Sequence, residues 1–292
     1  MNTGLDRLAR DICFRIEDEL RRSGIFYRIF SRVKSIESIE KKIILKDYAN
    51  SAENKKLQDI IGIRVTMYFE DDLPIIYNNI KRRFNFLDES IDEIDVNIFE
   101  PHKVNLIFRM TDEDAKEVQD VAVSKYSFID TTYEVQLRTV LSEGWHEVEH
   151  DLRYKCKNDW IEHSDISRIF NGVYASLVTS DWSIMSIFEK LAYRHYKNKK
   201  WEALLRNKFR LRIMDGELDN RIISILNNDN DLAKELYKVD RNKFLQQIFT
   251  DGLRIPLTLS NLIYIINAYC LHDEKIRLLA PEFIKNNKKL YK

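Results

Sequence analysis

The residues best suited to chemistry lie near the middle of the chain, in a short segment where apolar and polar side chains alternate. Alternation over 132–138 is typical of a β-strand that buries one face, here the face of Tyr133 and its apolar neighbours. The other face then presents a carboxylate, an amide and a guanidinium in a row, from Glu134, Gln136 and Arg138. Such groups can bind phosphate, hold a cation or orient a hydroxyl, although the pattern also suits the solvated face of an edge strand.

Two segments upstream supply more charged groups of the same kind. Residues 31–38 contain Arg32 and Lys34, and residues 59–65 contain Asp59 and Arg64. Transfer of a phosphoryl group needs cations on the phosphates, carboxylates for magnesium and an aligned attacking oxygen. Taken singly, the two cations of the first segment also fit a solvated helix start, and the aspartate fits a turn or helix cap.

Together and in this order, these segments resemble the signature of RelA/SpoT-family alarmone synthetases. The first resembles R-x-K-x-x-S, with Ser38 one position later than in that pattern. The second matches D-[IL]-x-G-[IL]-R-[IV], and the third matches E-V-Q-L-R-T followed by W-x-x-x-E-H-D-L-x-Y-K. The resemblance covers roughly residues 25–157 and leaves the C-terminal half outside. It implies an ATP-dependent pyrophosphokinase that transfers the β,γ-pyrophosphate of Mg-ATP to the 3′-hydroxyl of a guanine nucleotide, giving a (p)ppGpp-type alarmone.

The resemblance also assigns the ATP site. It implies that Arg32 and Arg64 sandwich the adenine, because a planar guanidinium can stack on a base and an ammonium cannot. It further implies that Lys34 and Lys42 contact the ATP phosphates as point charges, with Ser38 completing the ATP-binding block.

The same resemblance assigns the metal and the acceptor side. It implies that Asp59 and Glu134 bind Mg²⁺, the expected cofactor, since this hard cation prefers carboxylate and phosphate oxygens. Glu134 would also orient and deprotonate the acceptor hydroxyl. The remaining contacts to phosphate or acceptor would come from Gln136, Arg138, His150 and Lys155.

One family feature is missing. Members that act on GTP or GDP carry a loop of the form P-K-x-x-G-Y-x-S-x-H, whose Tyr stacks on guanine. Residues 99–106 here read Phe-Glu-Pro-His-Lys-Val-Asn-Leu and contain no Gly-Tyr pair. The acceptor could therefore be the 3′ end of tRNA, as in toxin-like members, or the chain could be an inactive nucleotide-sensing or partner-binding module. The run of cations and aromatics at 194–201 would suit RNA, or an ordinary solvated face.

A rival motif overlaps the third segment. Residues 146–150, His-Glu-Val-Glu-His, match the H-E-x-x-H zinc-protease pattern, which places two histidines on one helix face. A third ligand could come from Glu162, His163 or Asp165. The longer RelA/SpoT match already explains Glu149 and His150 without zinc, so the protease is the weaker hypothesis.

Composition limits the remaining possibilities. Lys+Arg and Asp+Glu are equal at 47 each, which excludes a generally polybasic nucleic-acid binder. The three cysteines are odd in number and far apart, and the N-terminal segment has no apolar stretch, so we expect a cytoplasmic protein without a disulfide framework or membrane partner. A homo-oligomer is plausible.

The pattern of apolar residues predicts the elements that position these groups. Helical periodicity occurs at 5–20, 35–49, 74–84 and 139–155, and strand patterns occur at 60–69, 104–110, 132–138 and, more weakly, 121–128. Further helices are expected at 166–191, 201–213, 218–225, 232–249 and 257–271. We therefore predict an α+β fold. Residues 1–158 would form a mixed sheet flanked by helices, which the family resemblance implies is nucleotidyltransferase-like, and residues 159–292 an all-α domain.

Overall fold

A computed structural model describes residues 3–45, 57–91, 104–118, 129–214 and 216–291. Packing divides the chain into two compact units. The first contains Met1–Asp18 and Tyr27–Thr179, and the second contains Glu19–Phe26 and Ser180–Lys292. The two are described separately below. The domain boundary expected near residue 159 remains a prediction, and by packing alone the chain divides after Thr179.

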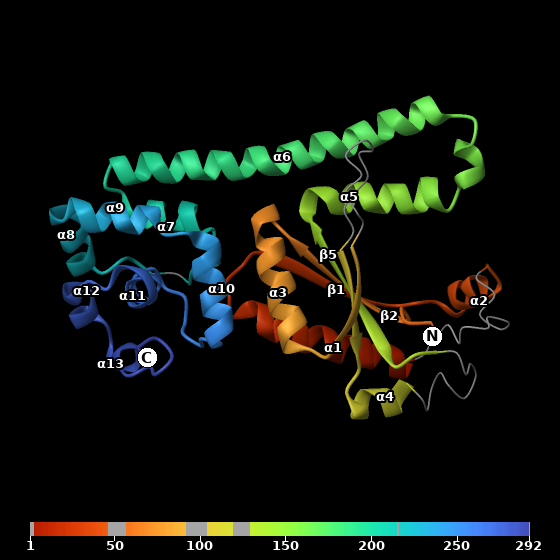
Figure 1. The fold of residues 1–292 in the computed structure, drawn as a ribbon, viewed down its shortest axis with the longest axis horizontal. Helices are drawn as coiled ribbons and strands as arrows, with labels where there is room; N and C mark the ends of the chain where they lie inside the picture. Colours follow the sequence, from red (N-terminus) through yellow and green to blue (C-terminus); the bar gives the residue numbers. More distant parts are fainter. Residues whose placement is uncertain (1–2, 46–56, 92–103, 119–128, 215, 292) are drawn as a thin grey trace. The chain divides into compact units, whose positions relative to one another are not determined.

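The first unit is built around one five-stranded mixed sheet with the order β1-β2-β5-β4-β3 (Figure 1). β2 and β5 are parallel, and the other neighbouring strands are antiparallel. The strands are β1 (Tyr27–Val33), β2 (Ile61–Met67), β3 (Phe86–Ile91), β4 (Val104–Arg109) and β5 (Thr132–Thr139).

Alternation along the central strands separates an apolar face from a polar one. In β2 the side chains of Ile61, Ile63 and Val65 are fully buried, and in β5 so are Val135 and Leu137. These β-branched and leucine side chains form the core on one face of the sheet. The intervening residues of both strands, which include arginine, glutamate and glutamine, lie on the opposite face.

Helices surround the sheet and continue beyond it. Those in the first half of the chain are α1 (Thr3–Arg21), α2 (Ile36–Leu45), the 3₁₀ turn η1 (Glu70–Asp72), α3 (Leu73–Arg83), α4 (Asp112–Val118) and α5 (Val140–Val148). A π-helical segment, η3 (Glu149–Tyr154), extends α5, and the 3₁₀ turn η4 (Lys157–Trp160) leads into the long helix α6 (Ser164–Lys197).

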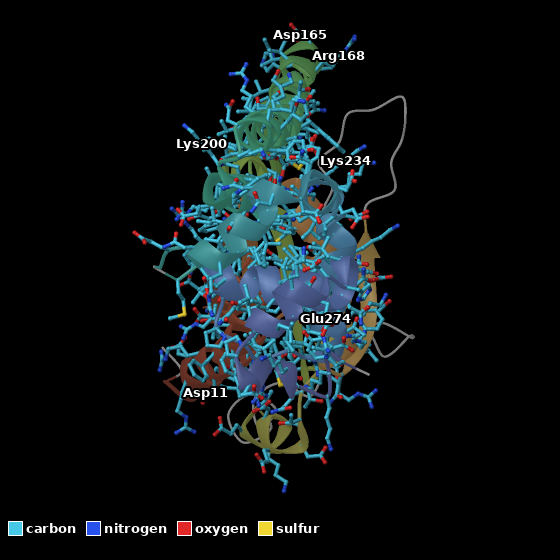
Figure 2. All side chains as sticks on the ribbon, turned by 90° about the vertical axis from the view of Figure 1, so that its left-hand side faces the viewer. Asp11, Asp165, Arg168, Lys200, Lys234 and Glu274 are labelled. Carbon is cyan, nitrogen blue, oxygen red and sulfur yellow. The ribbon has the colours of Figure 1, made fainter. Side chains whose placement is uncertain are left out.

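The second unit consists of short helices with a common apolar interior. Its helices after α6 are α7 (Trp201–Phe209), α8 (Asn220–Asn228), α9 (Asn230–Lys238), α10 (Arg241–Asp251), α11 (Leu259–Ile266), the π-helical η5 (Asn267–Leu271), α12 (Glu274–Leu279) and α13 (Glu282–Lys285). Most begin at a polar side chain that accepts a backbone N–H, as Asp229 does from Leu232. Figure 2 shows Lys200, Lys234 and Glu274 pointing outward from this unit.

The mixed sheet flanked by helices and the helical C-terminal region confirm the predicted fold class. The strands predicted at 60–69, 104–110 and 132–138 are β2, β4 and β5, whereas β1 and β3 were not predicted. The segment expected as one helix at 232–249 is two helices, α9 and α10. The possible strand at 121–128 and the end of the helix predicted at 35–49 lie outside the described residues.

Two further expectations concern cysteines and membranes. Cys13, Cys156 and Cys270 are all free thiols. Among the helices that the structure describes, none has the length and apolar character needed to cross a bilayer.

Candidate active site

The strand register brings the three sequence segments together on the polar face of the sheet. Arg32 of β1 pairs with Gly62 of β2, and Gly62 pairs with Glu134 of β5. Two residues farther along the same strands, Arg64 of β2 pairs with Gln136 of β5. Because paired residues in neighbouring strands project from the same face, these groups share one surface. Their types are those expected for a nucleotide site.

Helix α5 contributes two carboxylates to this surface that were not predicted from the sequence. Arg64 donates from Nε to Oε1 of Gln136 at 3.1 Å and from Nη1 to Oε1 of Glu143 at 2.5 Å. The same Nη1 also donates to Oε1 of Glu147. Gln136 in turn donates to Oε2 of Glu134 at 3.0 Å. A continuous hydrogen-bonded chain therefore runs from α5 through Arg64 to Glu134.

The position of α5 follows from the end of β5. Thr139 accepts a hydrogen bond from the backbone of Ser142, whose side chain accepts one from the backbone of Thr139, so the pair forms a capping box. The helix therefore starts directly after the strand, and its residues at positions 143 and 147 share one face by their i, i+4 spacing. This spacing and the cap place both glutamates on one face of α5, but they do not indicate which residue that face contacts.

Electrostatics hold Arg64 firmly in its charged form. Desolvation by burial lowers the pKa of Arg64, but attraction to Glu143 and hydrogen bonds with both glutamates outweigh this effect, and the pKa is raised above its ordinary value. Two carboxylates facing one guanidinium leave the group of three with a net negative charge.

The second charged pair lies where β1 and β2 meet. Lys34 Nζ lies 2.5 Å from Asp59 Oδ2, and both side chains are about four-fifths buried, at 21% and 23% exposed. The backbone N–H of Lys34 donates to the carbonyl of Ile60 at 2.8 Å, which extends the ladder between the two strands. The predicted phosphate-binding lysine and the predicted metal ligand are therefore direct neighbours.

The carboxylates at the starts of β2 and β5 fit a magnesium ion. Asp59 precedes β2 directly, and Glu134 is the register partner of Gly62 in the same strand pair. Mg²⁺ is commonly held by one or two carboxylates, with waters and substrate phosphates as its other ligands. Within the described ranges, no group of three or more His, Cys, Asp or Glu forms a denser cation site. Both residues remain the predicted magnesium ligands.

The rest of the predicted ATP block lies at the start of α2. Ser38 stands in the first turn, where its backbone N–H and side chain both bond with the Ser35 hydroxyl, at 3.3 and 2.8 Å. Lys42 lies farther along this helix, and its side chain is outside the described residues. Arg32 lies in β1 rather than at a helix start, and Lys34 lies in the short connection between β1 and α2.

Arg138 occupies an inner position on the polar face. It is only 6% exposed, and it donates to Oδ1 of Asn105 at 3.1 Å and to the carbonyl of Leu137 at 2.8 Å. In this structure the guanidinium thus ties β5 to β4. Its predicted role as a phosphate or acceptor contact stays a prediction.

His150 and Lys155 gather around a different carboxylate. Nδ1 of His150 lies 2.9 Å, and Nζ of Lys155 2.6 Å, from Oδ1 of Asp151. Hydrogen bonds with these two residues lower the pKa of Asp151. All three side chains are exposed, in or just beyond the π-helical segment η3. They form a separate group from the Arg64 chain of hydrogen bonds.

The residues of the H-E-x-x-H pattern do not converge. The His146 ring is buried between Trp145 and Tyr174, with ring centroids 5.6 and 5.9 Å away. Glu147 instead faces Arg64, and His150 is exposed in the π-helical segment η3. The described residues thus provide no three-ligand cluster for zinc, because His146 packs in the core and Glu147 contacts Arg64.

The aromatic residues of the cationic run at 194–201 are used for packing within the second unit. Trp201 is buried and its indole N–H donates to Asn227 at 2.9 Å, while Tyr196 stacks on Tyr237 at 4.8 Å. The lysines of the run are exposed, which is the arrangement of a solvated helix end. The acceptor loop at 99–103 lies outside the described residues.

Comparison with known proteins agrees with this geometry. Residues 31–159 match the family described as the region found in RelA / SpoT proteins. The GTP pyrophosphokinase YwaC of Bacillus subtilis (strain 168) is 27% identical over 134 residues, a match that spans 44% of this chain and 59% of that relative.

Solved structures give weaker similarities. A GTP pyrophosphokinase family protein from Streptococcus pneumoniae is 22% identical, with 61% of this chain and 87% of that one covered and a TM-score of 0.44. Small alarmone synthetase 1 from Bacillus subtilis is 18% identical, with 62% and 92% covered and a TM-score of 0.43. Because TM-scores below 0.5 do not establish a common fold, the similarity rests on the sequence matches. Residues 31–159 therefore resemble the region found in RelA / SpoT proteins, and 134 residues of the chain are similar to part of a GTP pyrophosphokinase.

Proposed function

We propose that the chain is an ATP-dependent pyrophosphokinase that transfers the β,γ-pyrophosphate of ATP to the 3′-hydroxyl of a guanine nucleotide. The observation that carries this proposal is the register of β1, β2 and β5. It gathers Arg32, Arg64 and Glu134 onto one sheet face from three segments that are far apart in sequence. A solvated polar face requires no such convergence, whereas a site for two nucleotides does.

The roles of the residues follow from their chemistry. Arg32 and Arg64 offer planar cations on which the adenine of ATP can stack. Lys34 supplies a compact positive charge for the triphosphate, so that charge developing on the transferred group is neutralised in place. These side chains position ATP and neutralise its phosphate charge, which are the main contributions of a protein to phosphoryl transfer.

Glu134 acts on the acceptor. Its carboxylate takes the proton of the 3′-hydroxyl as the oxygen forms a bond to the β-phosphorus of ATP. The bond between that phosphorus and the oxygen bridging it to the α-phosphorus breaks, and AMP leaves with the electron pair. A magnesium ion held by Asp59 and Glu134 would supply further positive charge at the phosphates. Gln136 keeps the Glu134 carboxylate oriented through the 3.0 Å hydrogen bond.

A second acceptor is favoured by one observation in the sequence. The segment at 99–106 lacks the Gly-Tyr pair that stacks on guanine in the resembling enzymes. The 3′ end of tRNA also presents a ribose hydroxyl, and its use would need no such loop.

The test is incubation of the protein with γ-³²P-labelled ATP and Mg²⁺, with GDP, GTP, AMP, ADP or deacylated tRNA offered separately. Label on GDP or GTP, lost in the Glu134→Gln variant, supports the proposal. Label on tRNA alone would show that tRNA, and not a guanine nucleotide, is the acceptor of the same pyrophosphate transfer. ATP binding with no labelled acceptor would show an inactive nucleotide-binding module and overturn the proposal.

A further inference from the structure

The Arg64 guanidinium is held by more partners than a salt bridge needs. Its Nε donates to Gln136 on β5, and its Nη1 donates to both Glu143 and Glu147 on α5. All guanidinium N–H bonds lie in the plane of the group. Partners on two of its edges therefore fix both the position and the orientation of that plane.

We propose that Glu143 and Glu147 are positioning residues that hold Arg64 in the plane required for stacking on the nucleobase of ATP. This inference rests on the proposed function and deepens it. In-plane hydrogen bonds leave the two faces of the guanidinium for a base, since stacking uses the faces and hydrogen bonding the edges. The two glutamates can thus keep their bonds while the base is bound.

We call Glu143 and Glu147 the clamp on Arg64. The family signature quoted above does not include these two positions. The pattern E-V-Q-L-R-T followed by W-x-x-x-E-H fixes neither position 143 nor position 147. Glu147, which would be the general base of the H-E-x-x-H pattern, hydrogen-bonds with Arg64 instead.

Stability alone does not account for both glutamates. The Glu147 side chain is 54% exposed, and an ion pair with so exposed a partner contributes little to folding. The Arg64–Glu143 pair is more buried, at 29% and 20% exposed, so thermal unfolding is needed to separate its effect on stability from its effect on binding. The effect of the two glutamates is expected in binding, because an arginine that is already ordered loses less conformational freedom when the base arrives. Immobilising one long side chain on binding weakens affinity by roughly tenfold, which sets the size of the effect expected on losing the clamp.

The experiment compares leucine and glutamine at both positions. Leucine at 143 and 147 removes the acceptors, whereas glutamine keeps an oxygen that can accept the same hydrogen bonds without the charge. We measure the Kd of a non-hydrolysable ATP analogue by calorimetry, together with KM for ATP and kcat in the transfer assay. Asp112→Leu/Glu113→Leu, which removes two exposed carboxylates from α4, is the charge-matched control. Thermal unfolding verifies that each variant is folded.

We expect Glu143→Leu/Glu147→Leu to raise Kd and KM for ATP roughly tenfold with kcat at saturating ATP unchanged, and Glu143→Gln/Glu147→Gln to stay within about twofold of the wild type. Wild-type Kd in the leucine variant overturns the proposal, and so does an equal loss in the glutamine variant, since charge rather than positioning would then matter. If the wild type binds the analogue but transfers nothing, the Kd values still decide the role of the clamp while the proposed function fails. No binding by the wild type overturns both.

Discussion

Gly62 offers a direct test of where the nucleotide lies. It stands between Arg32 and Glu134 in the central row of the polar face and leaves that point of the sheet without a side chain. A Cβ atom added there would meet only the carbonyl oxygen of Arg32, at 3.9 Å, which is an ordinary van der Waals contact. Gly62→Ala therefore fits the folded chain, and we expect it to stabilise the protein by about 0.4–1 kcal/mol, because alanine restricts the unfolded chain.

Activity should respond in the opposite direction. Gly62→Val places two methyl groups on the surface that the proposed site requires, and valine is well suited to a strand. Since a displacement of about 1 Å can cost roughly 100-fold in rate, we expect the valine variant to lose at least that factor in pyrophosphate transfer, with alanine intermediate. Initial rates with labelled ATP measure the loss of transfer activity, and thermal unfolding measures the change in stability.

Gly172→Ala is the matched control. Gly172 is exposed on α6, and a Cβ there would have no atom within 4 Å. Replacing a helical glycine by alanine stabilises by about 1 kcal/mol, so this variant should gain stability and keep its transfer rate. A folded Gly62→Val protein with the wild-type rate would refute the placement of the nucleotide on this face of the sheet.

Three further predictions concern chemistry and stability. Asp59→Asn and Glu134→Gln should each abolish transfer without unfolding the protein, with a loss of about 1–3 kcal/mol for Asp59→Asn because its ion pair with Lys34 is largely buried; AMP production at the wild-type rate in either variant would contradict its assignment. Leu204→Ala, at a fully buried position in α7, should destabilise the second unit by about 2–5 kcal/mol in denaturant unfolding; an unchanged midpoint would count against the packing described. Asp219 caps α8, and hydrogen bonds from Arg221 lower its pKa. The ionised Asp219 carboxylate therefore stabilises the protein above its unfolded-state pKa, and this stabilisation is lost as pH falls through its folded-state pKa. Asp219→Asn keeps a capping side chain, and its stability deficit at neutral pH should disappear in acid; a deficit independent of pH would refute the ionic origin.

The central strands could be predicted because their alternation is clean. In β2 and β5 every second residue is a buried aliphatic or aromatic side chain, and this period is what the sequence displays. In β1 the buried side also alternates, but Phe30 stands on the opposite side, 55% exposed. A large apolar residue on the polar face obscures the period, so the strand that carries Arg32 was not recognised.

The other differences have similar local causes. β3 contains the polar run Asp88 to Ser90, has an irregular register at its start and pairs only with β4, so it lacks the apolar continuity of a central strand. Apolar spacing runs without interruption across Val239, which made α9 and α10 look like one helix. The signal missed was Asp240, whose side chain accepts the backbone N–H of Lys243 and begins α10.

The clamp on Arg64 could not be predicted from the sequence by any local rule. Its glutamates lie 79 and 83 residues away along the chain, and only the parallel register of β2 and β5 brings them together. The family resemblance assigned Arg64 to the base but left its partners open. The sequence thus predicts chemistry-bearing residues by type and order, whereas the side chains that contact them are visible only in the fold.

The two cation pairs of the site should respond differently when ATP binds. Lys34 is a compact charge, and its contact with Asp59 uses the same ammonium that a phosphate would need. Arg64 can keep its in-plane bonds to α5 and still offer a face to the base. We expect Lys34 to turn from Asp59 toward the phosphate, while Arg64 keeps its partners. Once Lys34 has turned away, the Asp59 carboxylate is available to bind the divalent cation. We therefore expect the triphosphate and the divalent cation to strengthen each other's binding, and we expect Lys34→Met to remove that coupling.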